Sequence, residues 1–340
     1  MSHFPVIVMD SPPGRFRALV EGFTKCLPGV SSYKIISVHN FGLFDFKYPH
    51  GLTFSRLPFI GEPQWKQREF VAGDVSLPAP TLCYGVHDGK VVSLPKDDLA
   101  LVLKEASEII CACSPDPRGA HAFQTLLEQT LGATAASQSH RVLPLMSMSE
   151  RGVEDAFNAG HTTDGEGFRG LLNRAEAKRF FDYNFNTNSF MVFGKALRAV
   201  GVENPTLMSK WMLQVLFWFE ADRRHGPFSE GAVFKHMCDW SGWVPHAPKP
   251  FPGVVGSPTS QVVMLENLLS MGLLRRVGHR DLEVSDRGTA FILQIHPDCQ
   301  DMDLPWRLPK WEANWPESRP SIERYLRTFF GRQNRYRPRK

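Results

Sequence analysis

Short apolar runs alternate with helical patterns through the first half of this 340-residue chain, and this alternation restricts the folds that it can adopt. Val6–Met9 is an apolar run that ends in a turn, after which apolar residues recur at helical spacing. Ile109–Cys113 is a nearly continuous apolar run, as expected for a strand that helices cover on both faces. We therefore predict an α/β fold with an open parallel sheet, whose functional crevice lies at the carboxyl ends of the strands.

The second half of the chain is mainly helical in pattern and contains a segment that looks like a winged helix. Ser260–Met271 has a helical period, and Leu273–Arg276 and Leu282–Val284 are strand-like with a turn between them. Pro245–Pro258, rich in proline and glycine, is the best candidate for a linker or loop. These patterns predict a mainly α-helical second part with a winged-helix-like segment.

The net charge and the cysteines exclude few classes of function, but they indicate a cellular compartment. The formal net charge of +4 is too small to indicate a nucleic-acid partner by itself. The six cysteines are scattered without a disulfide framework, which favours a reducing compartment. There is no signal-sequence pattern, and the most apolar segment, Trp211–Phe219, is shorter than the roughly 20 residues of a membrane span. We expect a cytoplasmic protein with no membrane partner.

Five segments resemble, in the same order, parts of type IA DNA topoisomerases, especially the topoisomerase III branch. Three are similar to the Toprim half of that family: VIVMDSPPGRFRALVEGF, DLALVLKEASEIICACSPDPRGAHAFQTLLEQTLG and RVLPLMSMSERGVEDAFNAG. Two later segments are similar to its Arg-x-x-Asp helix and to its Gly-x-Pro-x-Thr helix with the following hairpin: RGLLNRAEAKRFFDYNF and GSPTSQVVMLENLLSMGLLRRVGHRDLEVSDRGTAFI. The segment that holds the family's gate domains and catalytic tyrosine is missing, because Val200 leads almost directly into Thr206.

The resemblance implies a division into three parts. These are a Toprim-like domain over residues 1–160, a helical and winged-helix-like DNA-binding domain over 161–330, and a basic tail over 331–340. Tyr183 falls at a structural position of the Arg-x-x-Asp helix, and we do not interpret it as a nucleophile. Cys111 and Cys113 alternate on an apolar strand, so we expect them in the core and not as a metal pair.

A Toprim site of this family gathers carboxylates around Mg²⁺, which prefers octahedral oxygen ligands. At the matching positions this chain has Asp10, Ser114, Asp116 and Arg118, so two potential ligands of four remain. Both also have structural interpretations, since Asp10 can cap a helix and Asp116 between two prolines is a good turn former. Arg118 instead offers a guanidinium that can grip a phosphate. Asp10 and Asp116 are thus the candidate Mg²⁺ ligands, and we expect no other cofactor.

The winged-helix-like segment has the local pattern most typical of DNA binding. The start of its helix can face phosphates, and arginines cluster along its hairpin. The residues that we expect to contact DNA are Arg15, Arg118, His121, Arg179, Ser260, Gln261, Arg275, Arg276 and Arg280. The basic tail can add salt-sensitive affinity or be a solvated end. Aromatic residues within Trp211–Phe219 could stack on unpaired bases, but their spacing favours a core role.

From the resemblance we expect a DNA-binding protein that holds single-stranded DNA without cutting it and assists DNA processing. The resemblance also implies a bacterial or mobile-element setting and contact with other DNA-processing proteins. Two alternatives remain open. One is an active type IA topoisomerase or Mg²⁺-dependent Toprim nuclease that works with a partner. The other is a protein-interaction scaffold.

Overall fold

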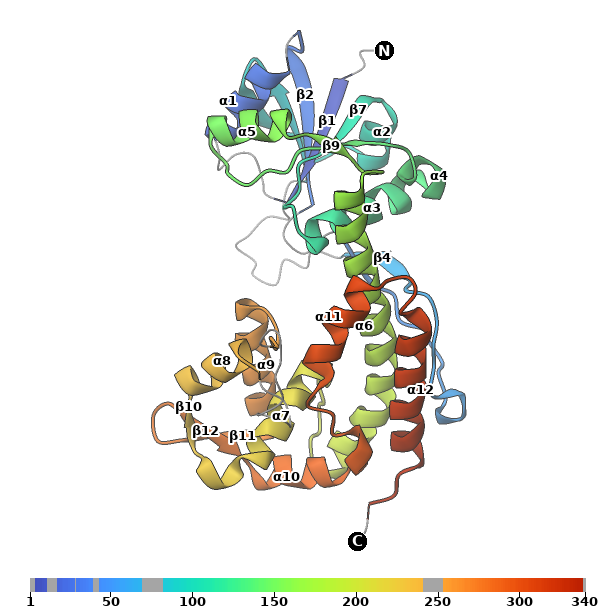
Figure 1. The fold of residues 1–340 in the computed structure, drawn as a ribbon, viewed down its shortest axis with the longest axis vertical. Coiled ribbons are helices and arrows are strands. Elements are labelled where there is room, and N and C mark those ends of the chain that lie inside the picture. The colour runs from blue at the N-terminus through green and yellow to red at the C-terminus, as the bar shows by residue number, and fades with distance from the viewer. Residues whose placement is uncertain are drawn as a thin grey trace. The chain divides into compact units, whose positions relative to one another are not determined.

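The computed structural model describes residues 4–10, 17–27, 29–38, 43–68, 82–240 and 253–338 (Figure 1). The chain forms two compact units. The first comprises Met1–Lys47 and Gln64–Glu176, and the second comprises Tyr48–Pro63 and Ala177–Lys340. Helix α6 (Glu166–Ala199) begins in the first unit and continues in the second.

A seven-stranded sheet in the order β6-β5-β2-β1-β7-β8-β9 forms the centre of the first unit. The four middle strands, β2, β1, β7 and β8, are parallel, whereas β5, β6 and β9 pair antiparallel at the two edges. The strands are β1 (Phe4–Met9), β2 (Ser32–Ser37), β5 (Cys83–His87), β6 (Lys90–Ser93), β7 (Ala106–Cys111), β8 (Arg141–Val142) and β9 (His161–Thr162). The predicted α/β class is confirmed, and the antiparallel edges are an addition that the apolar runs did not indicate.

Helices cover both faces of this sheet because successive residues of its central strand point to opposite sides. Val6 and Val8 of β1 belong to one buried cluster, and Ile7 and Met9 belong to the other. The first cluster is covered by α2 (Leu99–Lys104) and α3 (Pro117–Leu131), and the second by α1 (Arg17–Cys26) and α5 (Glu150–Asn158). Cys111 and Cys113 are buried, as predicted, and all six cysteines are free.

Two smaller features complete the first unit. Strands β3 (Phe44–Phe46) and β4 (Trp65–Gln67) pair antiparallel as a separate two-stranded sheet, and α4 (Ala133–Ala136) follows α3. Asp98 caps α2 by accepting the backbone N–H of Ala100 at 2.9 Å.

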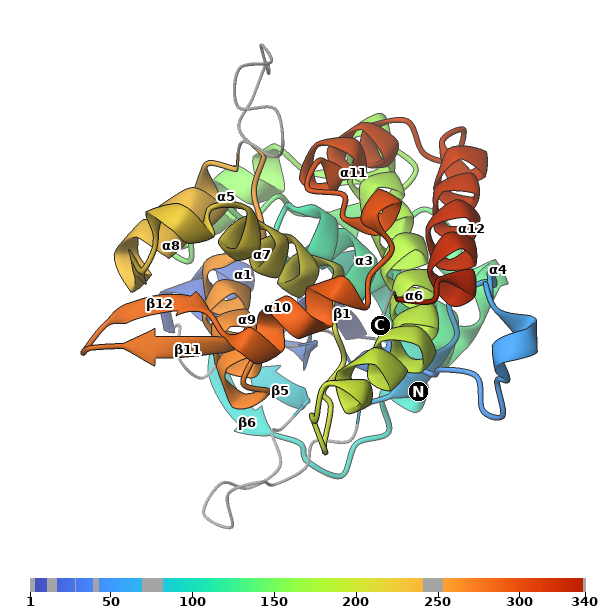
Figure 2. The same cartoon turned by 90° about the horizontal axis from the view of Figure 1, so that it is seen from below.

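The second unit has the element order of a winged helix. Helix α7 (Lys210–Ala221) precedes β10 (Phe228–Ser229), α8 (Glu230–Cys238), α9 (Pro258–Ser270), β11 (Leu274–Val277), β12 (Asp281–Val284) and α10 (Asp286–Leu293). The three strands form one antiparallel sheet in the order β10-β12-β11. Figure 2 shows the β11–β12 hairpin beside α9 and α10. The predicted winged-helix-like segment is present, within two residues of the expected bounds of its helix and strands.

The second unit also contains η2 (Phe54–Arg56), η3 (Arg223–His225), η4 (Pro297–Cys299), α11 (Leu304–Ala313) and α12 (Arg319–Arg335). Of these, α11 and α12 pack against α6. Phe185 of α6 lies 5.1 Å from Phe330 of α12 between ring centroids. The predicted basic tail begins within α12, because Gly331–Arg335 form its last turn.

The aromatic stretch on α7 belongs to the core, as its spacing favoured. Phe217 and Phe219 are fully buried, and Trp218 stacks on the ring of His236 at 4.3 Å. Tyr183 is also buried and stacks on Tyr48, so its phenol lies in the interior of the second unit. Within the described residues, none of the helices combines the length and the apolar character that crossing a membrane requires.

Candidate nucleic-acid interface

The carboxyl edge of the central sheet, where β1 and β7 end, contains the two candidate metal ligands. Because β1 and β7 are parallel neighbours, the segments that follow them leave the sheet at the same edge. Asp10 follows β1 directly, and both of its carboxylate oxygens accept the backbone N–H of Ser114, at 3.0 and 3.1 Å. Asp10 therefore ties the loop after β7 to the end of β1.

Asp116 is the N-cap of α3. One carboxylate oxygen accepts the backbone N–H groups of Arg118 and Gly119, at 2.7 and 2.9 Å. The other oxygen pairs with the guanidinium of Arg118 at 3.1 Å. A Cβ at Gly119 would lie 2.1 Å from the carbonyl oxygen of Ser114, so only glycine allows this close approach of loop and helix. The hydrogen bonds of Asp116 thus agree with its interpretation as a turn-forming residue at the start of α3.

These two carboxylates also make contacts within the protein. Both oxygens of Asp10 share the single N–H of Ser114, and the oxygens of Asp116 accept from Arg118 and Gly119. Within the part of the chain that the structure describes, no group of three or more His, Cys, Asp or Glu side chains is arranged to hold a metal ion. We derive no chemistry through a metal at this edge.

The other predicted DNA contacts of the first unit have different surroundings. Arg118 is largely exposed and can turn outward from Asp116. His121 packs against the ring of Trp65 on β4 at 5.1 Å and hydrogen-bonds Thr125 at 3.2 Å. His121 thus connects α3 to β4. Arg15 lies outside the described residues.

In the second unit, the start of α9 is exposed and capped. Ser257 is the N-cap, its hydroxyl accepts the backbone N–H of Ser260, and the two hydroxyls are 2.9 Å apart. Ser260 is therefore accessible at a helix end that carries partial positive charge. The exposed face of the following turns contains Val262, Val263 and Glu266 and no lysine or arginine.

Gln261 does not belong to this exposed surface. It is buried, and its amide donates to the carbonyl oxygens of Val255 and Gly256 at 3.2 and 3.4 Å. Its side chain satisfies backbone groups of the segment that enters α9. Gln261 is a packing residue, and we leave it out of the candidate interface.

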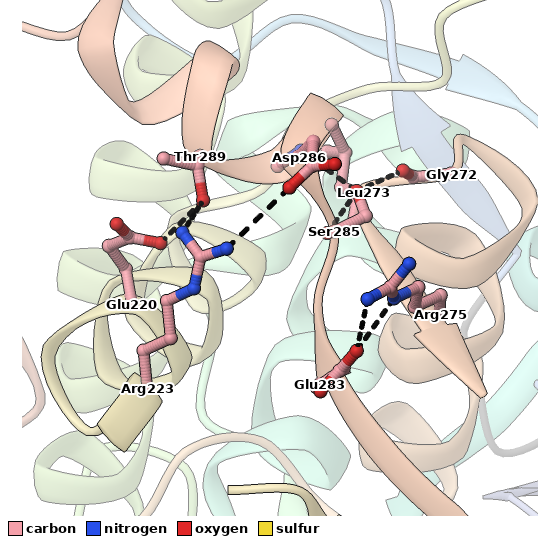
Figure 3. A network of polar contacts seen from close by, with 10 residues as sticks. Glu220, Arg223, Gly272, Leu273, Arg275, Glu283, Ser285, Asp286 and Thr289 are labelled. Atoms are coloured by element: carbon pink, nitrogen blue, oxygen red, sulfur yellow. Dashed lines mark hydrogen bonds and ion pairs between the residues drawn. The ribbon is translucent and has the colours of Figure 1, made fainter. Parts of the chain in front are cut away.

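We call the hairpin after α9 the wing (residues 274–284). It carries three arginines that we predicted to contact DNA, and these differ in whether an acidic side chain pairs with them. Arg275 pairs across the strands with Glu283 at 2.6 Å, as Figure 3 shows, and Arg276 pairs with Glu230 of α8 at 2.5 Å. Arg280 lies at the tip, two residues after Gly278, whose φ of 59° closes the turn, and its side chain forms no ion pair with any described residue. The tip is thus the part of the wing whose charge is least compensated.

A polar network that the sequence did not indicate fastens the end of α7 and η3 to α10 (Figure 3). Arg223 donates to Thr289 at 3.1 Å and pairs with Asp286 at 3.5 Å, and Thr289 donates to Glu220 at 2.8 Å. Ser285 caps α10. The partners are more than sixty residues apart in the chain, so no local pattern could have shown them.

Arg179 is half-buried on α6, one turn before an ion pair that the sequence analysis did not predict. Asp182 pairs with Lys210 at the start of α7, and the Lys210 ammonium lies 4.8 Å from the centre of the Phe181 ring. Burial lowers the pKa of Lys210 although Asp182 opposes this shift. Burial acts to raise the pKa of Asp182, but the positive charges of Lys210 and Lys178 outweigh it, so that this pKa lies below its ordinary value.

Comparison with models of known protein families finds no match for this chain. A search of curated proteins also finds no similar sequence.

Proposed function

We propose that this protein binds DNA, with a preference for single strands, and that it does not cleave the strand it holds. The observation that carries the proposal is the winged-helix order of the second unit together with an exposed, uncompensated Arg280 at the tip of its wing. A guanidinium at such a tip can pair bidentately with a phosphate. The absence of basic residues on the exposed face of α9 favours a backbone contact by the wing over base readout by that helix.

The proposal that DNA is held without cleavage has separate support. The candidate ligands Asp10 and Asp116 serve as internal hydrogen-bond acceptors, and Tyr183 is buried. We place the protein in a reducing cytoplasmic setting as an accessory in DNA processing, which suits its buried free thiols. Incubation of supercoiled plasmid with the protein and Mg²⁺ should give neither nicked nor relaxed product. Covalent protein–DNA adducts or relaxation would refute this part.

The binding itself is tested with labelled oligothymidine and duplex DNA over a salt series. Each phosphate contact to a single strand adds about 0.7 to the slope of log K against log salt concentration. We expect Arg280→Gln to reduce that slope by about this amount. Arg275→Gln should reduce it less, because Glu283 already neutralises Arg275. Lys90→Gln on the edge strand β6 is the control for a lost surface charge. Wild-type protein that binds neither DNA, or equal slopes for all variants, would contradict the proposal.

A further inference from the structure

Only two aromatic side chains are exposed among the described residues, and both lie on one part of the second unit. Phe54 in η2 is 40% exposed and Phe190 on α6 is 46% exposed. Phe190 contacts Tyr48, the first residue of the segment that contains Phe54, with ring centroids 5.2 Å apart. Elsewhere in the described chain, phenylalanine, tryptophan and tyrosine rings are at least half-buried, so this pair is not an average surface feature.

Two cations of α6 lie near these rings. The Lys195 ammonium lies 5.3 Å from the centre of the Phe54 ring. The guanidinium of Arg198 folds back over Gly194, one turn along α6 from Phe190, with nitrogens 3.7 and 3.8 Å from the position of a Cβ there. Within the described residues, neither Lys195 nor Arg198 forms an ion pair. The four side chains Phe54, Phe190, Lys195 and Arg198, here called the α6 patch, therefore contribute two positive charges and no negative one.

The backbone around Phe54 is held in place. Asn334 of α12 donates to the carbonyl oxygen of Phe54 at 3.3 Å, and Pro58 lies 3.8 Å from the position of a Cβ at Gly331. Figure 1 shows this segment alongside α12. The side-chain amide of Asn188 accepts the backbone N–H of Phe59 and donates to its carbonyl oxygen, and the amide of Asn184 makes the same two hydrogen bonds with Gly61. A ring presented by such an anchored segment loses little further freedom on binding.

We propose that the α6 patch is a second contact surface for single-stranded nucleic acid, with bases stacked on Phe54 and Phe190 and phosphates paired with Lys195 and Arg198. This inference rests on the proposed function and names a part of its interface. Exposed aromatic rings between cations are the arrangement that sequence-tolerant single-strand binding uses, because every base has a π face and every nucleotide has a negative charge. Duplex DNA hides its base faces, so the patch favours single strands.

The test uses the full chain, a labelled oligothymidine and binding isotherms over a salt series. Phe54→Leu and Phe190→Leu should each weaken binding by about 5- to 100-fold without changing the salt slope, because stacking is lost and charge is kept. Lys195→Gln and Arg198→Gln should each lower the slope by about 0.7. Leu293→Ala, which removes an exposed apolar side chain on α10, is the matched control and should bind as the wild type does.

A second measurement on the unaltered protein protects the test from folding artefacts. Photo-cross-linking to an iodouracil-substituted single strand should label Phe54 or Phe190. In a separate competition measurement, oligouridine should displace the DNA if the patch accepts RNA equally. Unchanged affinity of both phenylalanine variants, with cross-links only outside residues 48–63 and 184–199, would overturn the inference. The proposed function would survive that result if Arg280→Gln still weakens binding, and it would fail separately if the wild type does not bind DNA.

Discussion

Replacing Gly119 by alanine tests the geometry of the carboxyl edge directly. The new Cβ would lie 2.1 Å from the carbonyl oxygen of Ser114, well inside the 3.4 Å at which ordinary van der Waals contact begins. That carbonyl cannot move freely, because it accepts the N–H of Asp116 at 2.7 Å and the Ser114 N–H is held by Asp10. Overpacking of this kind costs about 1–3 kcal/mol, and loss of the Asp116 cap adds about 1 kcal/mol.

The expected total is a loss of about 2–4 kcal/mol from the free energy of unfolding of the first unit. Native-state hydrogen exchange at the buried amides of β1 and β7 reports that unit separately from the second. Their exchange should accelerate by about 30- to 1000-fold in Gly119→Ala. Gly170→Ala is the matched control, because it lies in α6 with nothing within 4 Å of the new Cβ. Gly170→Ala should raise the free energy of unfolding by about 0.4–1 kcal/mol and therefore slow the exchange. Equal exchange rates in Gly119→Ala and wild type would refute the close approach.

Two further predictions concern charged or titrating groups of the second unit. Asp182→Asn leaves the buried ammonium of Lys210 without its counter-ion, which should cost about 3 kcal/mol in urea unfolding, and the double variant with Lys210→Met should recover most of this loss. Recovery of nothing would show that the pair is not coupled. Burial lowers the pKa of His236 below its ordinary 6.5, although Asp222 and Asp239 oppose the shift. A lowered pKa in the folded state means that the unfolded chain binds the proton first, so the free energy of unfolding should fall as the pH drops below 6.5 toward the folded-state pKa. His236→Phe should remove that part of the pH dependence, and an identical pH profile in both proteins would contradict it.

Local patterns were sufficient where one face or one turn of the chain decides the structure. The apolar runs at Val6–Met9 and Ile109–Cys113 predicted two strands, the second of them covered on both faces, and the buried clusters confirm this. The period of Ser260–Met271 and the turn before Asp281 predicted the helix and wing of the second unit. Both predictions depend on side-chain periodicity, which is a property of a few consecutive residues.

The individual site residues could not be assigned in this way. Gln261 lies at the start of a helix in the sequence, yet the fold turns its amide inward to Val255 and Gly256. Arg275 and Arg280 have equal charge in the sequence, and only the strand register opposite Glu283 separates the compensated one from the uncompensated one.

The sequence by itself thus determined the class of the fold, the strands at Val6–Met9 and Ile109–Cys113, and the helix and hairpin of the winged-helix-like segment, because these depend on near neighbours along the chain. Tertiary structure alone decided which charges are neutralised, which polar groups are buried and which aromatic rings remain exposed. Phe54, Lys195 and Asn334 come together from three distant segments. Their proximity follows from packing around α6, and packing partners separated by more than a hundred residues leave no periodic signal in the sequence.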